Sequence, residues 1–409
     1  MRVGARVSTL LVAALLLGGC SGEAEVSAPE EEEVVISTVG AQLGLLEKLI
    51  ELHEARRPNA RVTLTQDFPA DTFQSGMGER LLKGITADHA DLEPVSRDGI
   101  NMPSKILAVN SRDGNLYGVP IGIARQSSFF YNPAVLESYG IDIDDLNRSG
   151  MAGVQALLDA CRVIATDPEN PIERPFALGN AYDWTLDMLL WEALFPAVAG
   201  PAYYPKFWEG EANPASDPEL EEALSTLLEL SRYFNADSAA IDFPEALERV
   251  AKGEAAFGQQ GDWGTGVLAT SGYSPGVEFS VMPFPGTKDI FVFSADVFPI
   301  VAGTPHRAAT QEFLNTIATP ETQVEINILR GTLPARSDID IEATDLSAVQ
   351  KATYEHFHSA VVHLPSVHGF KPDDVMADLA TIEKDMIVSG DTSELREYIT
   401  ANYALLQRW

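Results

Sequence analysis

Carboxylate and indole side chains occur together at points where the sequence predicts that strands end. Asp262 and Trp263 come just after residues 255–260, which form a predicted strand, and Trp184 precedes a predicted helix. Asp296 lies inside an extended apolar segment, where a carboxylate must find polar partners or face a cleft. Carboxylates accept hydrogen bonds from donor groups, and an indole offers a flat apolar face. These residue types could bind a small ligand that has both polar groups and an apolar face.

Each of these residues also has a purely structural interpretation. Trp263 and Trp184 can be core residues, and Asp262 can cap the helix that follows it. Enzyme chemistry has less support, because the chain has neither a Gly-x-Ser-x-Gly motif nor a Gly-x4-Gly-Lys phosphate loop. With 60 acidic residues, carboxylate pairs arise by chance and do not indicate a glycosidase. We predict no catalytic residue and no cofactor, and keep a secreted carbohydrate-active enzyme as an alternative.

Four of the seven histidines lie close together, at His356, His358, His363 and His368. Histidine is the commonest metal ligand, so a metal-binding lipoprotein is a second alternative. Histidines two residues apart on a helix point to different faces, and the spacing of the first pair therefore disfavours a shared metal. We predict no metal site.

The first part of the chain after residue 33 has the pattern of a strand–helix–strand unit. Residues 34–39 form an apolar strand, leucines then recur at helical spacing up to Arg57, and residues 61–65 form a second strand. Two strands joined by a helix are parallel. Further elements are predicted as helices over residues 151–165, 185–195, 219–234 and 245–252 and as strands over 128–131, 255–260, 279–285, 291–293 and 297–301. Strands mixed with helices favour the α/β class.

The N-terminus predicts export. Residues 1–19 combine Arg2 and Arg6 with a short apolar run, which is typical of a signal peptide. The sequence Leu17-Gly18-Gly19-Cys20 resembles the lipoprotein processing box, which implies lipidation of Cys20 and an anchor on the membrane facing the periplasm or exterior. Residues 20–33 are acidic and form a predicted tether. Cys161 then has no disulfide partner and is predicted to be buried.

Size and charge narrow the possible partners. The roughly 375 residues after the tether exceed the usual size of a single core, so two lobes are expected. A formal charge of −32 argues against nucleic acid as a partner. The acidity fits solubility in a saline exterior, and a cationic ligand is the alternative interpretation.

Eight short segments in a fixed order resemble the extracellular solute-binding proteins of ABC-type sugar importers, and most closely their glucose/mannose-type branch. The resemblance extends over the chain after the tether. The segments are Asp71-Thr-Phe-Gln74, Gly114-Asn-Leu-Tyr-Gly-Val-Pro120, Phe130-Tyr-Asn-Pro133, Ala177-Leu-Gly-Asn180, Gly261-Asp-Trp263, Phe293-Ser-Ala-Asp296, Arg330-Gly-Thr-Leu-Pro-Ala-Arg336 and Val367-His-Gly369.

This resemblance implies a two-lobed α/β periplasmic-binding-protein fold with the ligand cleft between the lobes. Lobe one would comprise about residues 34–132 with 287–335, and lobe two about 133–286 with 336–409, so the chain would cross the hinge near residues 132, 286 and 334. The protein would be a monomer that delivers a mono- or oligosaccharide or related polyol to membrane permease subunits. A non-sugar polar or cationic solute is the alternative.

The resemblance also implies which residues contact the ligand. They are Gln74, Arg125, Trp184, Asp262, Trp263, Asp296, Arg330 and His368. Arg330 stands where the resembling proteins usually carry lysine, and a donor role survives that difference. A tryptophan-rich segment of the glucose branch is replaced here by residues 37–42, and three of its polar contacts become Ser75 or Gly76, Gly122 and Ala124. These departures disfavour glucose itself as the ligand.

Overall fold

The computed structural model describes residues 32–38, 42–67, 70–78, 81, 91–169, 172, 174–182 and 184–407. The chain from Glu32 onward forms one compact unit. The predicted signal peptide, Cys20 and most of the acidic segment after it lie outside the described residues. Within the described part of the chain, no helix combines the length and the apolar character needed to cross a bilayer.

The first sheet forms as the sequence predicts. β1 (Glu32–Ser37) pairs in parallel with β2 (Ala60–Thr65), and α1 (Leu43–Arg56) connects the two strands. β3 (Thr72–Phe73) adds to the other edge of β1, also in parallel. β1 begins two residues earlier than predicted, because its pairing with β2 extends back to Glu32. The carboxyl ends of β1 and β3 therefore lie at the same edge of the sheet. Gln74 directly follows β3 at this edge.

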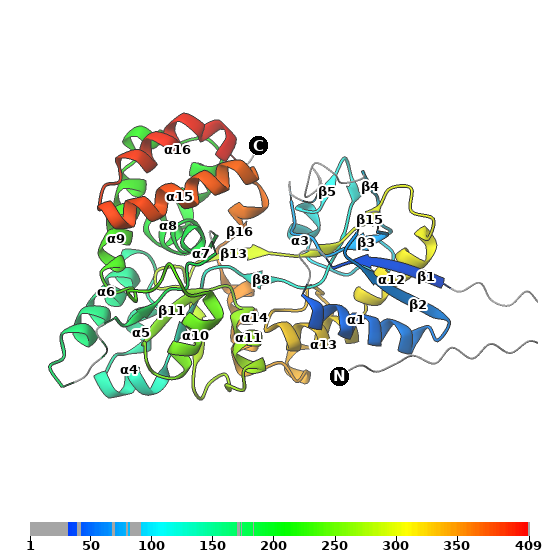
Figure 1. Cartoon of the computed structure of the whole chain (residues 1–409), viewed down its shortest axis with the longest axis horizontal. Helices are drawn as coiled ribbons and strands as arrows, with labels where there is room; N and C mark the ends of the chain where they lie inside the picture. Colours follow the sequence, from blue (N-terminus) through cyan, green and yellow to red (C-terminus); the bar gives the residue numbers. More distant parts are fainter. Residues whose placement is uncertain are drawn as a thin grey trace, which may run out of the picture. The chain divides into compact units, whose positions relative to one another are not determined.

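Helices from much later in the chain complete the core beside this sheet. α12 (Arg307–Ile317) and α13 (Pro320–Arg330) pack against α1, as Figure 1 shows. α1 turns Leu45, Leu46 and Leu49 inward, which follows from their helical spacing. Residues separated by more than 250 positions thus share one hydrophobic core.

A second sheet, ordered β10-β11-β9-β12, organises the middle of the chain. β9 (Ser128–Tyr131) is antiparallel to β11 (Phe257–Gln260) and β12 (Ser280–Pro283), whereas β10 (Phe176–Ala177) is parallel to β11. β11 is central and fully buried, so the loop after it emerges from the interior of the sheet.

Both faces of this second sheet are covered. Phe129 belongs to one hydrophobic cluster and its neighbour Phe130 to another, because side chains alternate along a strand. Cys161 is fully buried in the Phe129 cluster, which confirms the predicted burial. The helices of this region are α4 (Pro133–Tyr139), α5 (Ile143–Leu146), α6 (Met151–Thr166), α7 (Trp184–Met188), the π-helix η1 (Leu189–Leu194), α8 (Phe195–Trp208), η2 (Pro214–Ser216), α9 (Pro218–Ser231), α10 (Phe243–Ala251) and α11 (Gly264–Thr270).

β13 (Ile290–Ser294) is shared by the two cores. It pairs in parallel with β16 (Val362–Pro365) and antiparallel with β8 (Ala124–Arg125). Positions 290 and 292 belong to the cluster around Phe129, and positions 291 and 293 belong to the core around β1. One strand therefore presents alternate side chains to each core. Figure 1 shows β13 running from the elements around β11 to those around β1.

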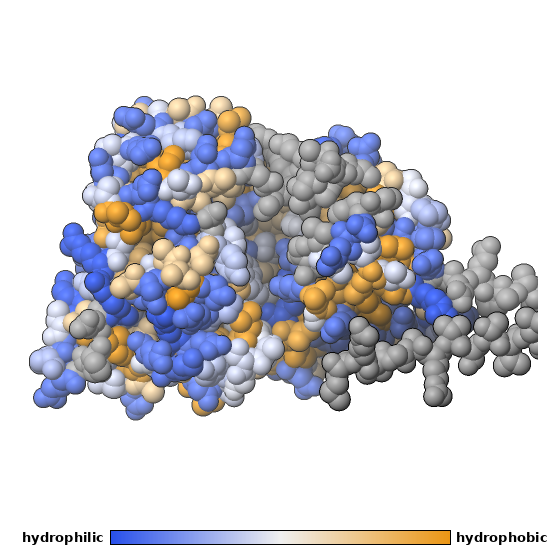
Figure 2. All heavy atoms as spheres, viewed as in Figure 1, coloured by the Kyte–Doolittle hydropathy of each residue, from blue (hydrophilic) through white to orange (hydrophobic). Residues whose placement is uncertain are grey.

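Short strands and C-terminal helices make up the other described elements. They are β4 (Leu92–Glu93), α3 (Ser104–Ala108), β5 (Ser111–Arg112), β6 (Asn115–Leu116), β7 (Val119–Pro120), β14 (Val297–Phe298), β15 (Ile300–Val301), η3 (Ile341–Ala343), α14 (Ala348–Ser359), η4 (Val367–Gly369), α15 (Asp373–Ser389) and α16 (Ser393–Leu406). Hydrophilic residues cover much of the face seen in Figure 2, with hydrophobic residues in scattered patches.

Candidate ligand-binding site

Asp262 lies on the loop that joins β11 to α11, as the sequence predicts. Its side chain is buried, with 1% exposure, and its backbone N–H donates to the Arg125 carbonyl at 3.0 Å. Neither carboxylate oxygen has a hydrogen-bond partner among the described residues. α11 begins after Trp263 without a side-chain cap, so the helix-capping interpretation of Asp262 is wrong. Its two buried acceptor oxygens therefore have unused hydrogen-bonding capacity.

The charge of Asp262 is balanced only in part. Burial raises the pKa of its carboxyl to about 7, although the positive charges of Arg125 and Arg330 pull the pKa down. A buried carboxylate without hydrogen bonds is unfavourable by several kcal/mol unless donors reach it. A ligand that brings hydroxyl donors would remove much of that penalty.

Arg125, at the end of β8, is the nearest fixed cation. Its Nε donates to Ser128 Oγ at 2.9 Å, and its Nη1 lies 3.2 Å from His356 Nδ1. The third nitrogen, Nη2, is buried without a partner among the described residues. Burial lowers the pKa of Arg125 to about 10, and the charge of Asp262 limits that fall. Arg125 therefore stays charged at neutral pH, and one of its donor groups has unused hydrogen-bonding capacity.

His356 supports Arg125 rather than a metal. Its Nε2 faces the Lys288 carbonyl at 3.0 Å, and its Nδ1 faces Arg125. These partners assign the proton to Nε2 and leave Nδ1 as the acceptor. Burial, and then the charge of Arg125, lower the pKa of His356 to about 3, so the ring is neutral. No group of three potential metal ligands occurs among the described residues.

Asp296, Arg330 and Gln74 form a second, connected group. Arg330 Nη2 donates to Asp296 Oδ2 at 2.8 Å, and Gln74 Nε2 donates to the same oxygen at 3.2 Å. The Arg330 side chain is 5% exposed and that of Asp296 is 25% exposed. Asp296 thus finds the polar partners that its apolar surroundings require. Gly331 follows with φ of 75°, which ends α13 and leaves Arg330 at its last turn.

Trp184 and Trp263 lie together at one side of Asp262. Their ring centroids are 6.4 Å apart, and both side chains are half-buried. Trp184 also stacks on Tyr182, with centroids 6.1 Å apart and planes 9° apart, and contacts Phe243. We call these four residues the aromatic platform. Its partial exposure favours a role in contact with a ligand over a purely core role.

The glycine of the Gly-Asp-Trp motif is required by the position of Trp263. A Cβ added at Gly261 would lie 2.0 Å from the indole ring. The ring therefore folds back over the backbone of residue 261, which only glycine permits. This close approach fixes the position of the Trp263 ring against the backbone of residue 261.

The structure brings seven of the eight predicted site residues into linked groups. Asp262 interacts electrostatically with Arg125 and Arg330, and Arg330 connects to Asp296 and Gln74. Trp263 adjoins Asp262 in the chain and contacts Trp184. His368 instead pairs with two carboxylates outside this set, Asp187 at 2.8 Å and Glu192 at 2.9 Å.

Three polar residues beside Asp262 were not predicted from the sequence. Gln259, Gln260 and Thr265 are buried, and Gln259 Oε1, Gln260 Nε2 and Thr265 Oγ1 have no partner among the described residues. The available signal was the presence of two consecutive glutamines at the end of a fully buried strand. A strand buried on both faces normally carries apolar side chains.

The fold and the site together define a class of protein. Two hydrophobic cores share the strand β13, and acceptors, donors and indole rings from distant parts of the chain converge around Asp262 and Asp296. Such a set of groups binds a polar solute. The chain belongs to the bacterial extracellular solute-binding protein family, whose family model matches residues 59–324.

Individual relatives agree with this family. An uncharacterized ABC transporter extracellular-binding protein of Pyrococcus horikoshii is 28% identical over 427 residues, which cover 95% of this chain and 93% of the relative. The xylose/arabinose-binding protein XacG of Haloferax volcanii is 30% identical over 315 residues, covering 75% of this chain and 65% of XacG. The bacterial solute receptor AcbH matches in structure with a TM-score of 0.76 at 15% identity, over 92% of this chain and 100% of AcbH. The AcbH match confirms the predicted periplasmic-binding-protein fold, and the family model supports a solute-binding rather than an enzymatic role.

Proposed function

We propose that the protein is the substrate-binding component of an ABC-type importer and that it captures a neutral carbohydrate outside the cytoplasm. The observation that carries this proposal is the buried Asp262 carboxylate, whose two oxygens lack partners beside Arg125, Arg330 and Trp263. Names of similar proteins support it, since XacG is a xylose/arabinose-binding protein and AcbH prefers galactopyranose.

Each proposed contact has a chemical reason. Asp262 would accept from two neighbouring hydroxyls, while Arg125 and Arg330 would donate to sugar oxygens. Asp296 and Gln74 would bind hydroxyls at the other edge of the ring. Trp184 and Trp263 would stack on its C–H faces. Both ring nitrogens of His368 already face carboxylates. A contact between His368 and the sugar stays a prediction.

The charges of the site favour a neutral ligand over a cationic one. The acidic residues Asp262 and Asp296 are matched by the basic residues Arg125 and Arg330, so the formal charge of this group is zero when all four are ionised. A cation would meet two fixed guanidinium groups at short range. The net charge of −32 is therefore better explained as a solvated exterior than as a trap for cations.

Glucose is not the sugar that we propose. The sequence lacks the tryptophan-rich segment and three polar contacts that the glucose branch usually carries, at residues 37–42 and near Gly76, Gly122 and Ala124. A Cβ at Gly122 would lie 2.1 Å from Asn327 Oδ1, so a larger side chain there would displace that amide. Pentoses and galactosides are the first sugars to test.

We infer that ligand capture involves two lobes, residues 34–132 with 287–335 and residues 133–286 with 336–409. The division is supported by the separate hydrophobic clusters and by β13, whose alternate residues belong to each cluster. Hinge bending at such a strand would close the lobes on the sugar. The closed monomer would then be recognised by permease subunits in the membrane.

We also propose that the mature protein is anchored by lipid on Cys20. The support is the sequence Leu17-Gly18-Gly19-Cys20 after a signal-like segment. Changing Cys20 to Ser should move the protein from the membrane fraction to the soluble fraction. Unchanged fractionation of the variant would contradict the anchor.

A panel of sugars tests the proposed function directly. Pentoses, hexoses, disaccharides, sugar alcohols and amino sugars should be compared by thermal shift, with one or more neutral sugars expected to stabilise the protein. Ligand at a hundred times its Kd stabilises by about 2.7 kcal/mol. A chelator should leave the shift unchanged, and chromatography should recover the sugar intact. Stabilisation by cations alone, or turnover of a sugar, would contradict the proposal.

A further inference from the structure

A cluster of buried charges makes no ion pair with Asp262, Asp296, Arg125 or Arg330 among the described residues. It comprises Asp187, Glu192 and Glu383, which have no exposed surface, with Lys371 at 3% exposure and the His368 side chain at 19%. We call these five residues the charge cluster. Burying five ionisable groups together is unfavourable unless they pair with one another.

His368 joins two of the carboxylates. Its Nδ1 lies 2.9 Å from Glu192 Oε1, and its Nε2 lies 2.8 Å from Asp187 Oδ2, an ion pair by distance without hydrogen-bond geometry. Burial by itself would lower the pKa of His368, but the charges of Glu192 and Asp187 outweigh burial and raise the pKa to about 9. The imidazolium is therefore charged at neutral pH.

The π-helical turn η1 explains how one ring reaches both carboxylates. Asp187 lies in α7 and Glu192 lies five residues later in η1. Because a π-helix closes i to i+5 hydrogen bonds, residues five apart across such a turn come closer to one face than in an α-helix, which aligns residues four apart. The unusual turn thus lets both acids face His368.

Lys371 supplies the second cation. Its Nζ lies 3.6 Å from Asp187 Oδ1 and 4.9 Å and 5.2 Å from the ring centres of Trp191 and Trp208. Trp191 Nε1 donates to Glu383 Oε1 at 2.7 Å. Burial and the charge of Asp187 raise the pKa of Glu383 well above its usual range. With Glu383 protonated, two carboxylates face two cations and the cluster is neutral.

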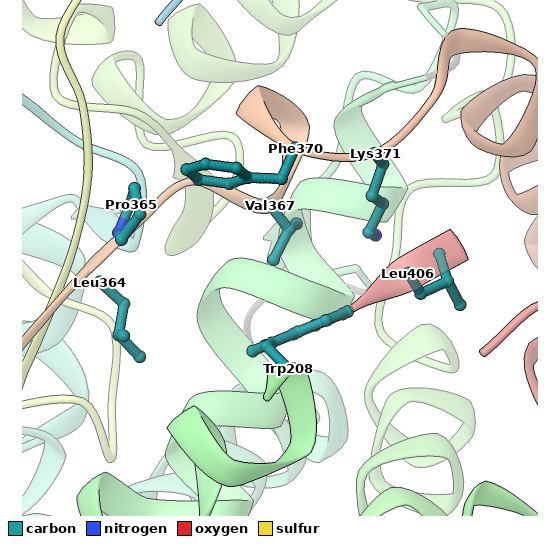
Figure 3. Close-up of a pocket in the computed structure, with 7 residues that line it drawn as sticks. All are labelled: Trp208, Leu364, Pro365, Val367, Phe370, Lys371 and Leu406. Atoms are coloured by element: carbon teal, nitrogen blue, oxygen red, sulfur yellow. The ribbon is translucent and has the colours of Figure 1, made fainter. Parts of the chain in front are cut away.

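The cavity beside Lys371 is too small for a solute. Figure 3 shows Lys371 directed toward Trp208, with Val367 and Phe370 nearby. The volume open to water is about 10 Å³, which is roughly the space of one water molecule, whereas solute sites measure about 300–1,000 Å³. The charge cluster therefore holds protein segments together and does not itself bind the sugar.

Those segments carry residues of the ligand-binding site. Asp187 is in α7, which begins at Trp184 of the aromatic platform. His368 and Lys371 flank Gly369, whose carbonyl would lie 2.8 Å from a Cβ at Gly78, four residues after Gln74. The backbone at residue 78, with φ of 71°, thus packs directly on the segment that carries both cations.

We propose that His368 and Lys371 are positioning residues that fix the helix beginning at Trp184 relative to the segment carrying Gln74, so that sugar affinity depends on the charge cluster. The expected loss of sugar affinity rests on the proposed function. The expected loosening of α7 can be measured without a ligand.

The first test is hydrogen–deuterium exchange of the unliganded protein with His368→Gln. Peptides covering residues 184–192 and 76–78 should exchange faster by about tenfold, because α7 loses its pairing. His53→Gln is the matched control, since it removes a more deeply buried histidine that contacts Thr316 on α12. That control should lower thermal stability and leave exchange at residues 184–192 unchanged. Unchanged exchange in His368→Gln overturns the inference, whatever ligand the protein binds.

The second test is the pH profile of affinity for whichever panel sugar binds. At pH 7, His368→Gln and Lys371→Met should each bind about tenfold more weakly. The advantage of the wild type over His368→Gln should vanish between pH 8 and 10, as the imidazolium of the wild type loses its proton. A constant ratio across this range overturns a charge-based role. If no sugar binds the wild type, the proposed function fails, while the exchange measurement still decides the positioning role.

Discussion

Replacement of Asp262 by Asn is expected to make the unliganded protein more stable at neutral pH. The pKa of the buried carboxyl rises from 3.8 to about 7 on folding. This shift corresponds to a penalty of about 4 kcal/mol in the free energy of unfolding when the carboxyl is ionised. Because the folded pKa is raised, the penalty is absent below pH 3.8, grows with rising pH and is complete above pH 7. An asparagine avoids it but still lacks partners, so we expect a net gain of about 2 kcal/mol at pH 8.

Urea unfolding at several pH values between 4 and 8 measures this effect. The stability of Asp262→Asn relative to the wild type should be highest at pH 8 and should fall by about 4 kcal/mol toward pH 4, where the variant is expected to be less stable than the wild type. Asp217→Asn is the matched control, because Asp217 is also buried but accepts from Leu220 N and from Tyr203 Oη. No gain is expected there. A loss of stability in Asp262→Asn at pH 8 would show that Asp262 is a structural residue.

The same substitution should weaken sugar binding. A carboxylate accepts hydrogen bonds at both oxygens, whereas an amide presents one acceptor and one donor. Losing a charged acceptor in a buried site costs about 2–3 kcal/mol, which is about a hundredfold in Kd. Calorimetry on the sugar found in the panel measures it. The combination of higher stability with lower affinity distinguishes a functional residue from a core residue.

Replacement of Arg330 by Met is expected to abolish detectable binding and to destabilise the protein. Arg330 is connected both to Asp296, by a 2.8 Å hydrogen bond, and to the charge of Asp262. Breaking a fully buried ion pair costs about 3–5 kcal/mol. Because water reaches the 25% exposed Asp296 side chain, we expect a smaller loss, about 2 kcal/mol.

Two further variants define what Arg330 contributes. Arg330→Lys keeps the charge and should retain binding within about tenfold. Arg307→Met removes a surface ion pair with Glu93, where the side chains are 49% and 29% exposed, and should change stability by less than about 0.5 kcal/mol. Normal sugar affinity in Arg330→Met would contradict the proposed donor role.

Much of the fold could be predicted because its signals are local. The β1–α1–β2 unit follows from an apolar strand, leucines at helical spacing and a second strand within 35 residues of sequence. Gly261-Asp262-Trp263 could be placed after a strand for the same reason, and the ring position of Trp263 explains its glycine. Asp296 was expected to find polar partners, and Arg330 and Gln74 provide them.

The charge cluster could not be predicted because its signals are not local. His368 meets Asp187 and Glu192 across more than 170 residues of sequence. One α-helix was predicted over residues 185–195, but the segment contains the π-helical turn η1, and helical periodicity alone does not separate the two forms. Without that turn, the shared orientation of Asp187 and Glu192 toward one imidazole is not apparent.

A crystal structure with the stabilising sugar would show whether Asp262 binds the ligand. Sugar hydroxyls are expected within hydrogen-bonding distance of both Asp262 oxygens and of Asp296 or Arg330, with a ring face against Trp263 or Trp184. A sugar bound elsewhere, with the Asp262 carboxylate still lacking partners, would contradict it.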